Sequence, residues 1–438
     1  MINIKSGNPN YLCKVVRLEG VKKHPNADRL QTAVVDFQTI ITGLNAKDGD
    51  LYVYFPIESK INLEFLKFTN SFSNAEENKD PKQKGFFGKH GRVRATRLRE
   101  IVSEGYVVPV SSINNWLTEA SIYFQLSEDD LDKSFDSFGD VVFCEKYIPL
   151  NQKGPSNQGP KSGKVKKESK LVENQVRLHV DTKHLKREIG NIAPEDWIEV
   201  CSKWHGSNAS ISRLLVKKKL NLIDKLAKFF GANIISTEYD LLYTSRRVIK
   251  STMYVDEICD GYYNSNIWKI VAEKYKDCLK DGITCFGELV GFTPSGGGIQ
   301  GLFDYGCAPN ECDFYVFRVT YTSPVGDVYE FSLNQVTEYC EKHGLKHVPV
   351  YFVGRAKDMY PELDTEIHWR ENFIKKLSDQ FLEKECIYCV NKVPAEGIVV
   401  SRRSFDGYEA YKLKSLNFLI AEGVQLDKGE GCLEDGNS

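Results

Sequence analysis

The segment from Asn151 to Lys170 limits how this chain can fold more than any other feature of its sequence. Lys, Gly, Pro, Ser, Asn and Gln fill it almost completely, and Val165 is its single aliphatic residue. So few apolar side chains cannot bury enough surface to order the segment. We therefore predict a flexible linker over residues 151–170, with one domain before it (residues 1–150) and one after it (residues 171–438).

Length and composition agree with two globular domains. The chain has 438 residues, more than a single domain usually holds, and 41% of them are hydrophobic. No apolar run is long enough to span a bilayer, and the first residues lack the apolar stretch of a signal peptide. We expect a monomer without membrane contact, in the cytoplasm or nucleus, with its 12 cysteines reduced.

The first domain is rich in short segments with strand character. β-branched and aromatic residues dominate these segments, and Pro, Asn, Asp and Gly separate them. Five short strands with polar connections predict a small β-barrel. The expected strands are residues 11–18, 30–37, 39–42, 51–55 and 104–110.

The second domain mixes strands with helices, which predicts an α+β fold. Helical periodicity runs over residues 267–279 and 367–381, and Ser332 with Gln335 forms a capping box before a helix that should end at Gly344. The glycine-rich stretch 295–301 predicts a flexible loop, because it lacks the context of a phosphate-binding loop. Strands are expected at residues 197–201, 283–290, 314–319, 396–400 and 408–414.

Two cysteine pairs, Cys386 with Cys389 and Cys307 with Cys312, could together form a four-thiolate zinc site. Isolated CxxC spacings are common, however, and these pairs lack the usual turn glycines. Buried thiols are the better interpretation.

Lys203 has the sequence context of a nucleophile. It follows an apolar strand in Lys203-Trp-His-Gly206, so it should lie where a strand ends and the chain turns. A lysine attacks phosphorus only as the free amine, which its ordinary pKa disfavours at neutral pH. Neighbouring cations lower such a pKa, and Lys412 and Lys414 supply two of them on one face of a later strand.

Two carboxylates and one aromatic residue complete the set. Glu288 and Glu396 lie within apolar strands, where a buried charge needs a partner such as a divalent metal or a ribose hydroxyl. Phe314 begins the aromatic strand Phe-Tyr-Val-Phe and could stack on a base. Each pattern alone is common, so their order and spacing carry the inference.

In that order, the pieces resemble the motifs of the covalent nucleotidyltransferase superfamily of ligases and capping enzymes. Motif I is similar to Lys203-Trp-His-Gly-Ser-Asn208, and the arginine motif to Tyr243-Thr-Ser-Arg246-Arg247. Motif III is similar to Phe286-Gly-Glu-Leu289, and motif IIIa to Phe314-Tyr-Val-Phe317. Motif IV is similar to Glu396-Gly-Ile-Val-Val400, and motif V to Tyr411-Lys-Leu-Lys414. The histidine in KxHG, followed by Ser-Asn, resembles phage-type nick-sealing RNA ligases.

The resemblance implies an ATP-dependent RNA ligase with antiparallel sheets and flanking helices, acting on RNA breaks with 3′-hydroxyl and 5′-phosphate ends. Lys203 would carry AMP with help from Lys412 and Lys414, and Mg²⁺ or Mn²⁺ would bind Glu396 and Glu288. Either Arg246 or Arg247 fills the arginine motif. Phe314 would stack on adenine and Glu288 would hold the ribose. The nucleotide would contact His205, Gly206, Asn208, Arg246, Glu288, Phe314 and Glu396.

The first domain adds an independent resemblance. The segments His24–Leu30, Gly49–Tyr54 and Arg97–Pro109 are similar to the OB domain that precedes the catalytic domain in deinococcal and amoebal RNA ligases. DNA ligases and capping enzymes place an OB domain last, and too few residues follow Lys414 to form one.

A basic cluster in the OB-like part contains two aromatic residues, Phe86 and Phe87. Its basic residues are Lys82, Lys84, Lys89, His90, Arg92, Arg94, Arg97 and Arg99. A solvated loop is the plain interpretation. The functional interpretation is RNA binding, in which cations contact phosphates and an aromatic ring stacks on a base. The residues predicted to bind RNA are Lys89, Arg92, Arg94, Arg97 and Arg99.

Three alternatives stay open at this point: a DNA ligase, a capping guanylyltransferase and a non-catalytic RNA-binding protein. The last is disfavoured because Lys203, both strand carboxylates and both later lysines are all present.

Overall fold

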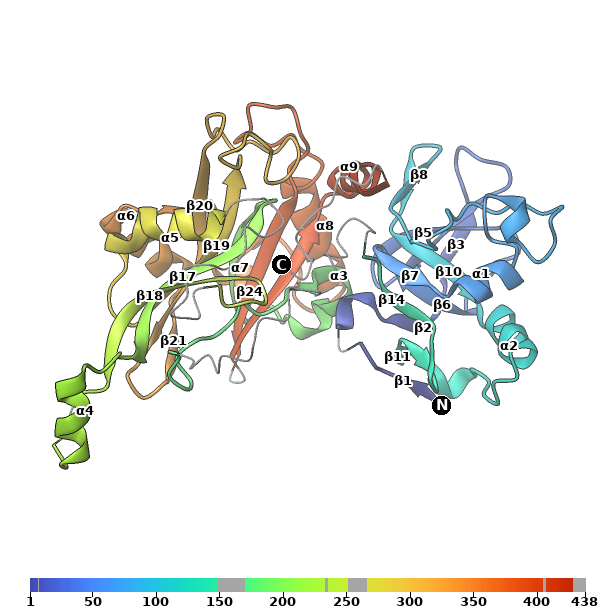
Figure 1. Cartoon of the computed structure of the whole chain (residues 1–438). Coiled ribbons are helices and arrows are strands. Elements are labelled where there is room, and N and C mark those ends of the chain that lie inside the picture. The colour runs from blue at the N-terminus through green and yellow to red at the C-terminus, as the bar shows by residue number, and fades with distance from the viewer. Residues whose placement is uncertain (7, 149–169, 233–234, 251–265, 405–406, 428–438) are drawn as a thin grey trace. The chain divides into compact units, whose positions relative to one another are not determined.

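The computed structural model describes residues 1–6, 8–148, 170–232, 235–250, 266–404 and 407–427. Contacts divide these residues into two compact units (Figure 1). The first unit holds residues 1–148 with Lys183–Asn191 and Leu416–Asp427, and the second holds the described residues of 170–182 and 192–415. The predicted linker lies outside the described residues except for Lys170, so the boundaries around it stay a prediction.

The first unit is built from short antiparallel strands. One sheet has the order β10-β6-β2-β11, and another has the order β3-β4-β5. All five strands expected from the sequence are present, as β2, β4, β5, β6 and β10. The strands are β1 (Ile2–Asn3), β2 (Cys13–Arg17), β3 (Glu19–Lys23), β4 (Gln31–Val35), β5 (Gln38–Thr42), β6 (Leu51–Pro56), β7 (Ser59–Ile61), β8 (Thr96–Leu98), β9 (Ile101–Ser103), β10 (Gly105–Pro109), β11 (Ser134–Phe135), β12 (Ser137–Phe138), β13 (Val141–Val142), β14 (Cys144–Lys146) and β15 (Lys183–His184).

Helices complete the first unit around an aromatic core. Phe65 of the first helix and Trp116 of the second pack with Phe143 in this core. The helices are α1 (Leu63–Phe68), α2 (Val110–Glu119), α3 (Leu185–Glu188) and α9 (Leu416–Asp427).

The second unit contains two sheets. The strand order is β25-β24-β16-β23 in one and β18-β17-β19-β20-β21 in the other, where β22 also pairs in parallel with β20. The other pairings are antiparallel, so the predicted α+β architecture is confirmed. The strands are β16 (Trp197–Lys203), β17 (Ser207–Lys217), β18 (Thr237–Ser245), β19 (Ile283–Gly291), β20 (Cys312–Thr322), β21 (Val328–Glu330), β22 (Lys346–His347), β23 (Val350–Arg355), β24 (Gly397–Ser404) and β25 (Gly407–Lys414).

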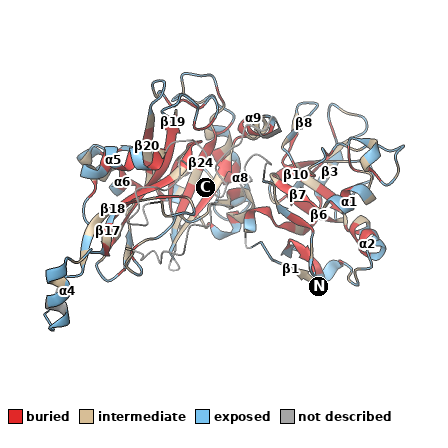
Figure 2. Cartoon of the chain, in the orientation of Figure 1, coloured by how far each residue is buried: buried red, intermediate tan, exposed pale blue. Residues whose placement is uncertain are grey.

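The helices of the second unit start and end where local chemistry directs. Ser332 and Gln335 form the predicted capping box, and Gly344 ends that helix at φ 73°, a conformation that favours glycine. Figure 2 shows the sheets largely buried, whereas α4 is mostly exposed. Among the described helices, none is long and apolar enough to cross a membrane. The helices are α4 (Leu222–Phe229), α5 (Ile267–Tyr275), α6 (Leu333–His343), α7 (Ala356–Met359) and α8 (Trp369–Phe381).

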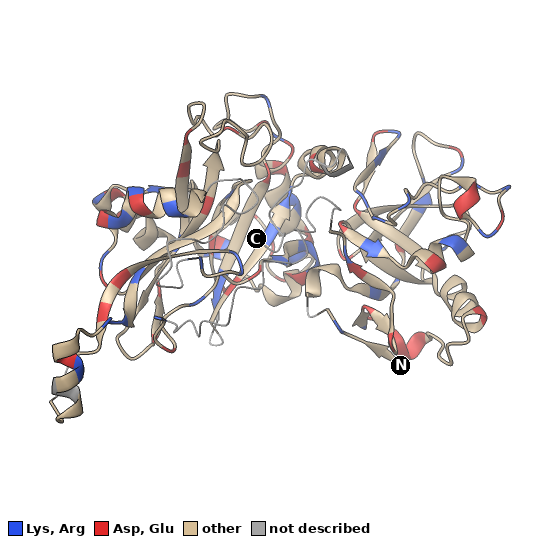
Figure 3. Ribbon diagram, viewed as in Figure 1, with Lys and Arg blue, Asp and Glu red and all other residues tan. Residues whose placement is uncertain are grey.

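Charge is mixed over both units. Figure 3 shows Lys and Arg interspersed with Asp and Glu along the ribbon. This distribution fits the formal net charge of −2, so any anion-binding site must be a local arrangement of cations.

Candidate active site

Lys203 ends β16, and the neighbouring strands place two other motif residues beside it. It lies opposite Gly397 on β24, which in turn lies opposite Lys414 on β25. Gly397 has φ 141°, and a Cβ atom there would lie 2.1 Å from the carbonyl oxygen of Leu413. Only glycine fits this position. Lys203, Gly397 and Lys414 therefore lie side by side, in one row, across three neighbouring strands.

Glu396 pairs with both lysines of that row. Its Oε1 lies 2.7 Å from Lys203 Nζ and 2.9 Å from Lys414 Nζ. The carboxylate side chain is 0% exposed, and the lysine side chains are 11% and 9% exposed. A buried charge is costly unless it is paired, so each of the three groups depends on the others. Glu396 thus holds two ammonium groups at one point.

A pocket opens beside Lys203, lined by residues from both sheets of the second unit. Lys412 lies on the same face of β25 as Lys414 and lines this pocket, as the alternation predicted. Asn208 and Glu288, which are register partners on β17 and β19, line it from the other sheet. Its further lining residues are His179, Thr182, Cys201, Ser202, Trp204, Arg246, Phe317, Leu333, Val348, Val399, Ser401 and Tyr408.

The turn after Lys203 is held by the loop between β19 and β20. Trp204 stacks on Tyr305 with ring centres 4.3 Å apart, and the backbone N–H of His205 donates to the Tyr305 hydroxyl at 2.6 Å. Gln300 Nε2 donates to the Gly206 carbonyl at 2.9 Å. The sequence analysis did not find Gln300 or Tyr305, because this loop carries no motif.

His205 and Gly206 have a different role from the predicted nucleotide contacts. Neither lines the pocket. The His205 ring is 1% exposed and packs edge-on against Phe303, and a Cβ at Gly206 would lie 2.4 Å from the Leu289 carbonyl oxygen. Both residues therefore shape the turn that presents Lys203.

Arg246, rather than Arg247, belongs to the pocket. Arg246 lines it, and its Nε and Nη2 lie 3.0 Å and 2.8 Å from Asp181 Oδ1. Arg247 reaches the same carboxylate at 3.6 Å from a more exposed position. Burial raises the pKa of Asp181, but the two arginines outweigh this and lower it overall. Asp181 therefore stays ionised and orients Arg246.

His179 is a pocket residue that the sequence analysis missed. Its ring lies between Phe286 and Phe317, at centre distances of 5.9 Å and 5.0 Å. Burial lowers its pKa to about 3, with help from the nearby cations Arg318 and Arg246. The imidazole is therefore neutral at physiological pH and can act as a polar, uncharged wall of the pocket.

This low pKa predicts an acid-dependent loss of stability. The unfolded chain binds a proton on His179 below about pH 6.5, whereas the folded chain does not until about pH 3, so stability falls as the pH drops through that window. Within this window, His179 alone lowers the free energy of unfolding by up to about 1.4 kcal/mol for each pH unit. We expect His179→Gln to show a smaller drop in melting temperature between pH 7 and pH 5 than the unsubstituted protein. Equal drops would contradict the assignment.

Phe314 does not lie where the adenine-stacking prediction requires. Its side chain is 0% exposed in the core cluster with Trp268 and Val271 of α5, and it does not line the pocket. Residues 314 and 317 lie on opposite faces of β20 because strand side chains alternate. Phe317 lines the pocket, so it replaces Phe314 as the aromatic candidate for base contact.

Arg318 joins the two sheets next to the pocket. Its guanidinium lies 4.6 Å from the ring centre of Phe286 on β19 and 4.6 Å from that of Tyr408 on β25. Its Nε also donates to Glu330 at 3.0 Å. A cation held between two rings stabilises their separation, so Arg318 helps to set the width of the site.

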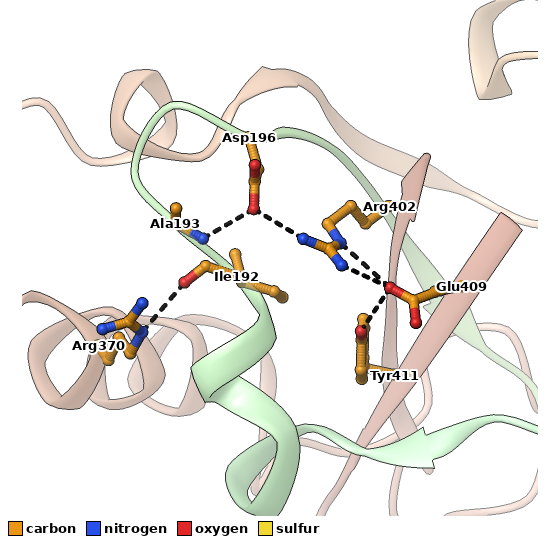
Figure 4. Close-up of polar contacts among 7 residues, drawn as sticks. All are labelled: Ile192, Ala193, Asp196, Arg370, Arg402, Glu409 and Tyr411. Carbon is orange, nitrogen blue, oxygen red and sulfur yellow. Dashed lines mark hydrogen bonds and ion pairs between the residues drawn. The ribbon is translucent and has the colours of Figure 1, made fainter. Parts of the chain in front are cut away.

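A polar network fixes the β24–β25 hairpin against the chain ahead of β16 (Figure 4). Arg402 donates to Asp196 Oδ2 at 3.1 Å and to Glu409 Oε2 at 2.7 Å, and Tyr411 Oη donates to the same Glu409 oxygen at 2.9 Å. Asp196 also accepts the backbone N–H of Ala193 at 2.8 Å. Since β25 carries both later lysines, the network helps to fix their register.

The described residues contain no group of three or more His, Cys, Asp or Glu side chains that could hold a metal alone. The predicted ligands are nevertheless suitable oxygen donors, because Glu288 and Glu396 are both buried beside the lysines or the pocket. Mg²⁺ is often held by one or two carboxylates together with substrate phosphates. The donors therefore fit a metal that a nucleotide phosphate helps to bind.

The basic cluster of the first unit divides into structural and exposed cations. Arg92 is 4% exposed, with Nη2 2.6 Å from Glu58 and Nη1 donating to the carbonyl of Gly423 on α9 at 3.2 Å. Its guanidinium is thus engaged inside the unit, which disfavours the predicted contact with RNA. Arg97 donates to Asn417 of α9 at 2.7 Å, although it remains exposed.

The exposed part of the cluster faces solvent, as RNA binding requires. Lys89, Arg94 and Arg99 are exposed. Phe86 is 61% exposed, whereas Phe87 is 2% exposed and belongs to the core. Phe86 and Arg94 line a second pocket, within the first unit, together with Tyr106. Phe86 is therefore the aromatic candidate for base stacking.

The four cysteines considered for zinc do not form a metal site among the described residues. They are not fully buried either, which corrects the buried-thiol interpretation, because Cys307, Cys312, Cys386 and Cys389 are each partly exposed.

Comparisons with known proteins agree with both parts of this description. A family model described as RNA ligase matches residues 196–414, and a model described as an OB-fold domain matches residues 12–110. No curated protein sequence matches the chain. The structure is similar to solved structures of the Naegleria gruberi RNA ligase.

Three of these structures illustrate the similarity. A mutant with ATP and Mn has a TM-score of 0.54 at 16% identity, over 94% of this chain and 99% of that chain. A mutant with AMP and Mn has a TM-score of 0.51 at 17% identity, over 96% of this chain and 99% of that chain. The ligase with PPi has a TM-score of 0.52 at 18% identity, over 94% of this chain and 99% of that chain. At such identity the likeness establishes the fold, which confirms the predicted architecture.

Proposed function

The chain belongs to the RNA ligase family, and we propose that it is an ATP-dependent RNA ligase that carries AMP on Lys203. The position of Lys203 supports this proposal most directly. Lys203 lines the pocket, and its Nζ lies 2.7 Å from the buried carboxylate of Glu396, which also pairs with Lys414. The family motifs and the pocket thus meet at one amine.

In the first step, Lys203 Nζ attacks the α-phosphorus of ATP. The new bond joins nitrogen to phosphorus, the bond to the bridging oxygen breaks, and pyrophosphate leaves. Lys203 must lose a proton first, and its ion pair with Glu396 favours the charged form. The Glu396 carboxylate, 2.7 Å from this nitrogen, can accept the proton as the amine attacks.

ATP and the metal are proposed from the similar ligase, whose structures contain ATP with Mn, AMP with Mn, and PPi. Glu288 and Glu396 would hold Mg²⁺ or Mn²⁺ together with the phosphates. When bound, the metal would neutralise negative charge on the transferring phosphate. Phe317 and His179 are the pocket walls available to the adenine, and Asn208 and Arg246 supply polar contacts.

Two further steps would seal the strand. AMP passes from Lys203 to the 5′-phosphate of the RNA, and the 3′-hydroxyl then attacks that phosphate and expels AMP. Each transfer replaces one phosphate bond by another, so the difficult joining reaction is divided into easier ones.

The proposal is tested by offering different nucleotides and breaks. Labelled ATP should modify the protein, whereas labelled GTP and NAD⁺ should not. Matched RNA and DNA nicks should be sealed only when the 3′-hydroxyl side carries ribose. Labelling by GTP would favour a capping guanylyltransferase, and equal sealing of all-DNA nicks would favour a DNA ligase.

RNA binding by the first unit gives a separate prediction. We expect replacement of Lys82, Lys84, Lys89 and Arg94 by Gln to weaken RNA binding and to reduce its salt dependence by about one unit of slope per lost phosphate contact. Phe86→Ala should weaken binding by about 1–3 kcal/mol with little change in slope, because stacking releases no counterions.

The matched control neutralises four other lysines of the same unit: Lys5, Lys22, Lys60 and Lys133. Salt titrations of RNA affinity compare the two sets. Unchanged affinity and slope in the first set, or equal losses in both sets, would favour a solvated loop.

A further inference from the structure

Cys386 and Cys389 lie in a turn of the second unit that the proposed reaction does not use. They lie on either side of a turn formed by Ile387 and Tyr388, which brings them close together, and both thiols are partly exposed. Ile387 and Val390 next to them are each 84% exposed, so the turn lies at the surface. A small oxidant can therefore reach this pair.

The thiol of Cys386 has a lowered pKa. Its interaction with Cys389, and with the backbone N–H groups of Tyr388 and Cys389, lowers this pKa to about 7, although partial burial opposes it. By contrast, burial raises the pKa of Cys201 to about 12 and that of Cys307 to about 11.

The turn is bonded directly to the loop that holds the segment after Lys203. The Asp304 carboxylate accepts the backbone N–H groups of Val390 and Asn391, each at 2.9 Å. Tyr305 of that loop stacks on Trp204, the residue next to Lys203, and the Tyr388 ring lies 5.2 Å from the Trp204 ring. Tyr388, which lies between the two cysteines, therefore connects the turn to the neighbour of the nucleophile.

We propose that Cys386 and Cys389 form a reversible redox switch, in which hydrogen peroxide converts them to a disulfide that slows the adenylylation of Lys203. The effect on adenylylation rests on the proposed ligase function, whereas formation of the disulfide does not. Low pKa, solvent access and a resolving cysteine nearby are the features of redox-sensing thiols.

The oxidation is balanced by peroxide alone. The Cys386 thiolate attacks one peroxide oxygen, the O–O bond breaks, and a sulfenic acid and hydroxide form. Cys389 sulfur then attacks the Cys386 sulfur and displaces the hydroxyl group, which leaves as water after the Cys389 proton is transferred. Two thiols lose two electrons in total, and peroxide gains them and ends as two water molecules.

Bond formation would disturb the site through Tyr388. A disulfide brings the two sulfurs to about 2.0 Å and so changes the shape of the turn that carries Tyr388. The Tyr388 and Tyr305 rings both pack against Trp204, and the Tyr305 hydroxyl also accepts the backbone N–H of His205. Because a shift of about 1 Å near reacting groups can cost on the order of a hundredfold in rate, we expect peroxide to slow adenylylation about tenfold or more.

The test measures disulfide formation and adenylylation on the same full-length protein. After treatment with hydrogen peroxide, peptide mass spectrometry should show Cys386 linked to Cys389, and a thiol reductant should restore both the thiols and the labelling by ATP. Cys386→Ser should be labelled normally and resist peroxide, because serine leaves the turn and Tyr388 in place but cannot form the disulfide. Cys389→Ser should accumulate a Cys386 sulfenic acid that a cyclic dione traps.

Cys307→Ser is the matched control, since it also lies in a partly exposed pair but has a raised pKa. It should remain as sensitive to peroxide as the unsubstituted protein. Absence of the Cys386–Cys389 disulfide, or the same peroxide inhibition in Cys386→Ser, would overturn the switch. Failure of the reduced, unsubstituted protein to accept AMP would instead overturn the ligase proposal, while the disulfide could still be observed.

Discussion

Lys203→Arg is expected to abolish sealing that starts from ATP, with a loss of about 10⁴-fold or more. Arginine keeps a cation opposite Glu396, so the buried ion pair with that carboxylate can persist. A guanidinium does not lose its proton in proteins, and it therefore cannot attack the α-phosphorus of ATP. Gel-based assays of lysyl-AMP formation and of RNA sealing measure the loss.

A substrate that already carries AMP provides the control for this variant. RNA with a preformed 5′-adenylate needs no lysyl-AMP, so Lys203→Arg should still join it to a 3′-hydroxyl at a readily measured rate. Loss of this reaction together with the first would indicate a damaged site rather than a missing nucleophile. Lysyl-AMP formation by the variant would contradict the assignment of Lys203.

Glu396→Gln should have the second largest effect. The substitution removes the buried anion shared by Lys203 and Lys414, and breaking a buried pair in this way costs about 3–5 kcal/mol. The two ammonium groups would then repel each other at the end of β16. We expect adenylylation to fall about 10- to 70-fold if half of that cost falls on the reactive arrangement. Single-turnover labelling measures the loss in adenylylation rate, and thermal unfolding measures the loss in stability.

Glu199→Gln is the matched control, because Glu199 is a buried carboxylate on the same strand as Lys203. It lies 3.7 Å from Arg403 rather than beside the lysines, and burial raises its pKa. The control should lose little adenylylation. If Glu199→Gln and Glu396→Gln slow labelling equally, loss of any buried charge in this sheet explains the effect, and the specific role of Glu396 is wrong.

The sequence was sufficient to locate the charged centre of the site. Lys203 and Lys414 end two different strands and Glu396 immediately precedes a third, yet each has a motif with a fixed place in the family order. The strand alternation predicted that Lys412 and Lys414 share a face, and their surroundings agree. Ionisable residues in apolar strands are conspicuous in a sequence, because they need partners there.

The walls of the pocket could not be predicted in the same way. Phe314 and Phe317 differ in which face of β20 they occupy, and only the packing of α5 against one face decides which ring is left for the pocket. His179 and Asp181 precede motif I in a segment without regular pattern. Their roles come from tertiary neighbours, namely Phe286 and Arg246.

The basic cluster shows the same limit in the first unit. A run of cations does not reveal which of them a distant segment covers. Arg92 is buried because Glu58 and the carbonyl of Gly423 satisfy its guanidinium, and Gly423 is more than 300 residues away in the sequence. The sequence therefore cannot separate a cation engaged inside the unit, such as Arg92, from one that is exposed to a phosphate.

The most direct test of the account is to locate AMP on the protein. The unsubstituted chain is incubated with ATP and Mg²⁺, digested with a protease, and its peptides are sequenced by tandem mass spectrometry under conditions that preserve the phosphoramidate bond. We expect AMP on the peptide that contains Lys203, attached to that lysine and to no other. AMP on Lys412 or Lys414, or a protein that acquires none although it binds ATP, would contradict it.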